Sequence, residues 1–97
     1  MKLCFDAELW PFDAGSKWVF LTLPDDESEA VREIPRPPAP GFGSVRVRVT
    51  IGATTWLTSV FPQAGGGPFI LPVKKAVRAA EGVEIGDVAS VTLEVLG

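Results

Sequence analysis

The feature that most constrains the fold is a strict alternation of apolar and polar side chains in short segments. In residues 45–51 (VRVRVTI), valine or isoleucine occupies every second position, with arginine or threonine between them. Residues 2–10 (KLCFDAELW) alternate in the same way. Because successive side chains of a strand point to opposite faces of a sheet, both segments predict half-buried strands. The chain is therefore expected to be mostly β.

The remaining segments predict more short strands, one acidic helix and a connector. Acids in the first turn suit the helix dipole in residues 25–34, and Asp26 with Glu29 has the spacing of a capping box. Residues 35–44 (PRPPAPGFGS) are expected to be a connector, because proline lacks the backbone donor that a sheet needs. Further strands are predicted at KWVFLTL (17–23), TTWLTSV (54–60), FIL (69–71) and VASVTLEV (88–95).

The stretch LPVKKAVRAAEGVEIGD (71–87) predicts a second, basic helix. Pro72 fits the first helical position, where its missing N–H costs nothing, and Gly82 is placed to end the helix in a left-handed conformation. One apolar stripe is expected, made of Val73, Ala76, Val77 and Ala80. The element order β-β-α-β-β-β-α-β lacks the periodicity of a parallel sheet and predicts an antiparallel barrel plugged by two short helices.

Length and composition bound the class of protein. The 97 residues predict a single domain spanning residues 1–97, which we expect to be a monomer because a barrel completed within one chain need not exchange hairpins. No apolar run approaches the roughly 20 residues of a membrane helix, and Asp6 and Glu8 interrupt the apolar N-terminus, unlike a signal peptide. Cys4 has no second cysteine to pair with, so a cytoplasmic location is expected.

Charge is distributed unevenly along the chain. The formal net charge is −3, which gives no global attraction to nucleic acid or to an anionic membrane. Residues 34–78, however, contain no acid at all. The bases of that segment are Arg36, Arg46, Arg48, Lys74, Lys75 and Arg78. Because the segments before and after it are net acidic, the overall charge of the chain does not reveal this basic central segment.

Two parts of the chain also resemble each other. FLTLPDDESEAVRE and FILPVKKAVRAA both read as strand, Leu-Pro and helix, and both contain Ala-Val-Arg, although the alignment needs a gap. Coincidence and duplication both explain this internal similarity. A duplication would produce two similar half-barrels, the first with an acidic helix and the second with a basic one.

Several ordered motifs resemble one family. WLTSVFP with the glycine-rich turn after it, FILPVKKAVR and GVEIGDVASVTLEV fill the last third of the chain, and FDAELW, WVFLTLP and GFGSVRVRVTIG precede them. Together they resemble the domain of unknown function numbered 1905, over nearly the whole length. The resemblance implies a double-split antiparallel β-barrel, a pseudo-barrel capped by two short helices and shared with the AbrB/MazE/MraZ-like regulators. It supplies no activity and no catalytic residues.

The basic residues form the candidate site. An anion site for a ligand, a peptide or a protein is the functional hypothesis, so we expect a non-enzymatic binding or interaction module without cofactor or metal. The alternative is a solvated face in which strand arginines pair with Asp6, Glu8 or Glu94. The candidate residues are Arg46, Arg48, Lys74, Lys75 and Arg78, with Trp56 and Phe69 as apolar neighbours.

Two other functions fit the sequence less well. An AbrB-like transcriptional regulator would bind DNA through the same cations, but a pI of about 4.8 argues against the concentrated positive surface that DNA binding needs. A hydrolase is less favoured still, because the chain has no histidine and no tyrosine. Asp6 and Glu8 lie about 7 Å apart along one strand, as hydrolytic carboxylate pairs do, yet their polar face predicts exposure to solvent.

Overall fold

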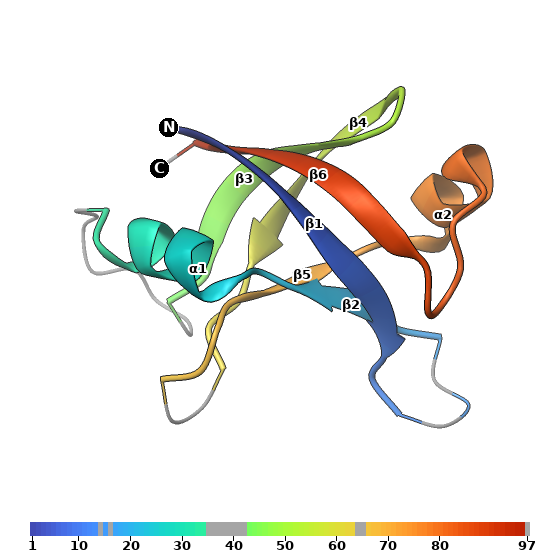
Figure 1. Ribbon diagram of the computed structural model, residues 1–97, viewed down its shortest axis with the longest axis horizontal. Coiled ribbons are helices and arrows are strands. Elements are labelled where there is room, and N and C mark those ends of the chain that lie inside the picture. Colours follow the sequence, from blue (N-terminus) through green and yellow to red (C-terminus); the bar gives the residue numbers. More distant parts are fainter. Residues whose placement is uncertain (14, 16, 35–42, 64–65, 97) are drawn as a thin grey trace.

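A computed structural model describes residues 1–13, 15, 17–34, 43–63 and 66–96. Within these residues, six antiparallel strands form one sheet in the order β4-β3-β6-β1-β2-β5. The sheet curls until its two edge strands, β4 and β5, meet at one bridge between Phe61 and Ile70, which makes a nearly closed barrel (Figure 1). The strands are β1 (Lys2–Pro11), β2 (Val19–Thr22), β3 (Val45–Ile51), β4 (Thr54–Val60), β5 (Ile70–Pro72) and β6 (Val88–Val95), and the helices are α1 (Asp25–Arg32) and α2 (Lys75–Glu81).

The predicted alternation is confirmed and produces the core. In β3, every second side chain from Val45 to Ile51 is buried inside the barrel, and Arg46 and Arg48 point outward. In β1, Phe5, Ala7 and Leu9 are buried in the same way. The predicted element order and the mostly β fold are also confirmed. No helix in the described part of the chain is long and apolar enough to cross a membrane.

The acidic helix begins without the predicted capping box. Pro24 occupies the N-cap position, and no side chain caps the helix there. Ser28 instead faces the barrel, where its hydroxyl donates to the Leu23 carbonyl over 3.3 Å and accepts from the Phe69 N–H over 3.1 Å. Glu29 is drawn away by Arg32, with which it forms an ion pair of 2.5 Å. The Ser28 hydroxyl therefore links α1 to the residues that follow β2 and precede β5.

The basic helix departs from its prediction in two respects. Pro72 is the last residue of β5 and does not begin the helix, which starts at Lys75. The apolar stripe is confirmed only in part, because Val73 and Val77 are buried whereas Ala76 and Ala80 are exposed. Val77 is thus the one side chain of this helix that is buried against the barrel. Gly82 ends it at φ 64° as predicted.

The two strand–helix units that resemble each other in sequence pair with each other in the structure. Strands β2 and β5 are antiparallel neighbours with Leu21 opposite Leu71. Leu23 N–H donates to the Phe69 carbonyl, and Val73 N–H donates to the Val19 carbonyl, both over 2.9 Å. Helices α1 and α2 consequently lie at opposite ends of the barrel (Figure 1). Of the predicted connector, residues 35–42 lie outside the described residues.

A carboxylate ties α2 to the β3–β4 hairpin. The Thr54 hydroxyl donates to Glu81 Oε2 over 2.5 Å, and the Ala53 N–H donates to Oε1 over 3.4 Å. Gly52, at φ 59°, lies under this carboxylate, and a Cβ at that position would collide with it. Glycine is thus required there both for its backbone conformation and for the close approach of Glu81.

We predict that Gly52→Ala lowers the free energy of unfolding by about 2 kcal/mol. About half comes from the left-handed backbone and about half from the displaced Glu81 hydrogen bonds. Gly82→Ala is the matched control, because it has a similar φ of 64° with nothing near its Cβ, and should cost about 1 kcal/mol. Urea unfolding measures both, and equal losses would show that the Glu81 contact contributes nothing.

Candidate functional site

The barrel is open between β4 and β5, and Pro72 explains why. Phe61 and Ile70 exchange two backbone hydrogen bonds of 2.9 Å, and the next pair in the same ladder would join Ser59 to Pro72. Proline has no N–H to donate, so one of the two hydrogen bonds of that pair cannot form. Residues 69, 71 and 73 bond to β2, which leaves position 72 facing β4. The pairing between β4 and β5 therefore stops at the bridge.

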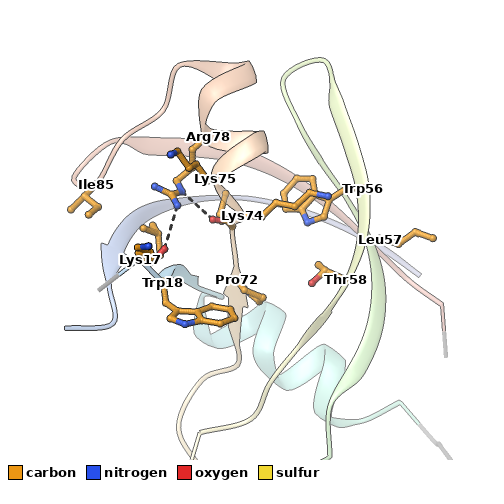
Figure 2. A pocket seen from close by; sticks show the side chains of 12 residues that line it. Lys17, Trp18, Trp56, Leu57, Thr58, Pro72, Lys74, Lys75, Arg78 and Ile85 are labelled. Carbon is orange, nitrogen blue, oxygen red and sulfur yellow. Dashed lines mark hydrogen bonds between the residues drawn. The ribbon is translucent and has the colours of Figure 1, made fainter. Parts of the chain in front are cut away.

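A groove of about 830 Å³ occupies this opening. It lies between β4 on one side and the β5–α2 segment on the other (Figure 2). The Phe61–Ile70 bridge bounds one end, and the contact between Glu81 and Thr54 joins α2 to the hairpin at the other. The lining residues are Lys17, Trp18, Val19, Trp56, Leu57, Thr58, Pro72, Val73, Lys74, Lys75, Arg78 and Ile85. Its volume is in the range of about 300–1,000 Å³ found for ligand pockets.

Four cations and no acid line the groove. Arg78 is partly committed to the fold, since its Nε donates to the Val73 carbonyl over 3.1 Å and its Nη2 to the Lys17 carbonyl over 3.4 Å (Figure 2). The ammonium groups of Lys17, Lys74 and Lys75 have no hydrogen-bond or ion-pair partner among the described residues. Three of the predicted cations are thus brought together, with Lys17 added.

Aromatic side chains supply the walls. Trp56 points from β4 toward Lys74 and is only 9% exposed, whereas Trp18, which precedes β2, is 64% exposed (Figure 2). Trp18 stacks on Phe20 with ring centroids 6.3 Å apart. An adjoining apolar hollow of about 430 Å³ shares Trp18, Thr58 and Pro72 with the groove. Its other lining residues are Phe12, Phe20, Phe61 and Ile70.

The other predicted site residues do not line the groove. Arg46 and Arg48 lie on the outer face of β3, and Arg48 Nη1 is 2.6 Å from Glu94 Oε1 on β6. That ion pair is one of the cross-strand pairs considered as the alternative to a binding role. Phe69 is 1% exposed in the core, with the Arg32 guanidinium 5.6 Å from its ring centroid. It is a packing residue and lies out of reach of a ligand.

Sequence reasoning missed Lys17 and Trp18. Both residues were placed in the predicted strand 17–23 and left out of the candidate site. They reach the groove because β2 pairs with β5, so that the residues before Val19 lie next to those after Val73. The sequence signal was their position shortly before FLTLPDDESEAVRE, the first of the two similar segments.

The comparison with protein families agrees with the motifs. The model of the domain of unknown function (DUF1905) matches residues 5–93. The chain belongs to this family. No curated protein matches it. The DUF1905 assignment covers every strand of the barrel and both helices, at least in part.

Other candidate groups of this DUF1905 domain stay at the surface. Asp6 and Glu8 are exposed on β1, and Asp6 accepts a hydrogen bond of 2.8 Å from the Ser90 hydroxyl. Cys4 is exposed on the same strand. Among the described residues, no three histidine, cysteine, aspartate or glutamate side chains gather as metal ligands. The groove is the place where charged and aromatic groups converge.

We predict that the Arg48–Glu94 pair is worth about 0.5 kcal/mol in this DUF1905 domain. The two side chains are 50% and 37% exposed, and exposed ion pairs contribute about 0.2–1 kcal/mol because water and salt screen them. A double-mutant cycle of Arg48→Ala and Glu94→Ala, measured by urea unfolding, gives the coupling. A coupling above about 2 kcal/mol would instead require a desolvated pair.

Proposed function

We propose that this DUF1905 domain is a non-enzymatic binding module that holds an anionic partner in the groove between β4 and α2. The observation that supports the proposal is a lining with four cations and no acid in a protein of net charge −3. A positive hollow on an acidic protein attracts anions to one place and repels them elsewhere. The partner is of the class expected from the sequence, but Lys17 and Trp18 replace Arg46, Arg48 and Phe69 as the residues that contact it.

Local electrostatics favour a bound anion. Lys74 and Lys75 are neighbours in sequence, and the ammonium groups of both lack a carboxylate partner in the described residues. An anion between them relieves the repulsion of like charges. Trp56 and Val73 form an apolar surface beside them, and a charge pair is stronger next to low-dielectric walls than in open water. Arg78 holds this arrangement by clamping the Lys17 and Val73 carbonyls.

The remaining expectations belong to the same proposal. A barrel of the double-split kind is supported by the two strand–helix units that pair about Leu21 and Leu71. We propose that the domain works as a monomer in the cytoplasm, without catalysing a reaction. An AbrB-like regulator that binds DNA is the alternative. The ion pair between Arg48 and Glu94 argues against DNA binding, because a neutralised arginine adds little to phosphate binding.

We predict that citrate binds in the groove and that Lys74→Glu/Lys75→Glu weakens it by about tenfold or more, equivalent to about 1.4 kcal/mol. Isothermal titration calorimetry at low salt gives the dissociation constants. Arg46→Glu/Arg48→Glu is the matched control: it reverses the same number of charges on the outer face of β3 and should change affinity less than about twofold.

Equal effects of the two double variants would mean that only net charge matters, which contradicts a localised site. Duplex DNA is titrated in parallel. Tight DNA binding with a steep dependence on the logarithm of salt concentration would favour the regulator and overturn the proposal.

A further inference from the structure

The edge of β4 that faces the groove has open backbone positions. Residues of one strand alternate in the neighbour to which they direct their N–H and C=O groups. Phe61 bonds away from β3, to Ile70, so Leu57 and Ser59, two and four positions earlier, also direct their backbone groups away from β3. In the described chain, strand pairing on that side of β4 is confined to the Phe61–Ile70 bridge. An added extended chain would supply the missing partners.

The groove also restricts how such a chain runs. A segment that pairs antiparallel with β4, from the bridge toward the hairpin, meets the Glu81 contacts to Thr54 and Ala53 after passing Leu57. A chain that ends before those contacts places its terminal carboxylate beside Lys74 and Lys75. The charges match, because Lys74 and Lys75 line the groove, whereas the Glu81 carboxylate at its end is outside the lining and already accepts hydrogen bonds from Thr54 and Ala53.

The apolar hollow next to the groove fits a side chain of the same segment. Phe12, Phe20 and Phe61 line it, and Trp18 is common to the hollow and the groove. Side chains of an extended segment alternate between its faces. A residue close to the chain end can therefore place a large apolar side chain in the hollow while the terminus reaches the lysines.

We propose that the groove binds the carboxyl-terminal segment of another polypeptide as an added strand on β4. The segment has a free terminal carboxylate, held by Lys74 and Lys75, and a large apolar side chain close to its end. This inference rests on the proposed function, because it specifies the anionic partner. Neither an internal acidic peptide nor a small carboxylate would use the open edge of β4, the two lysines and the apolar hollow together.

The test uses the whole chain, labelled with ¹⁵N, and a pool of N-acetylated tetrapeptides whose last and third-last residues vary among phenylalanine, leucine, tryptophan and valine. The expected result is a shift of the Leu57, Ser59 and Lys75 amide signals, with slower hydrogen exchange at Leu57 and Ser59. A pool that differs only in having amidated carboxyl ends should bind at least about tenfold more weakly. A pool with methylated backbone nitrogens should lose the protection at Leu57 and Ser59.

Controls separate this inference from the function on which it rests. Lys75→Glu should abolish the preference for the free carboxylate, whereas Arg46→Glu should preserve it. If citrate binds but the acid pool does not, the anion site stands and the peptide inference is overturned. Equal binding of the acid and amide pools also overturns it, as does binding of 4-phenylbutyrate as tight as that of the peptides, which would mark a site for small carboxylates.

Discussion

Burial of one apolar sheet face by closure of the sheet on itself is the constraint on which the rest of the structure depends. Alternate residues of the long strands point inward, so the buried side chains of the described residues are apolar apart from Ser28. The Ser28 hydroxyl donates one hydrogen bond and accepts another, and no buried side-chain polar atom in the described residues lacks a partner. Because burying a charge in such an interior is costly, charged side chains lie where closure of the barrel is incomplete or on its outer surface.

Incomplete closure between β4 and β5 brings cationic and aromatic side chains together. Trp56 belongs to the inner face of the sheet and Trp18 to its outside, yet both line the same groove. Helix α2 adds Lys75 and Arg78 at the upper side, and Glu81 keeps that helix attached to the hairpin. A closed barrel would have buried Trp56 completely and separated the lysines from any apolar surface. The mixture of charge and aromatic area arises from the gap itself.

The sequence predicted the strands because their alternation is a direct consequence of the buried face, as residues 45–51 illustrate. Pro72 was misplaced because Leu-Pro before a helix is typical of a helix start, and its pairing with Phe20 on β2 is a long-range fact. Arg48 and Lys75 could not be separated from sequence for the same reason. Which cation meets Glu94 and which faces the groove depends on strand order and barrel curvature, neither of which local patterns contain.

The gap beside Pro72 arises in the main chain, since it follows from one absent donor. The backbone gap and the side chains that line it are consequently separable in this architecture. Changes at Lys74, Lys75 or Trp18 would alter the charge and the aromatic area of the groove, whereas Pro72 and the opening beside it would stay in place.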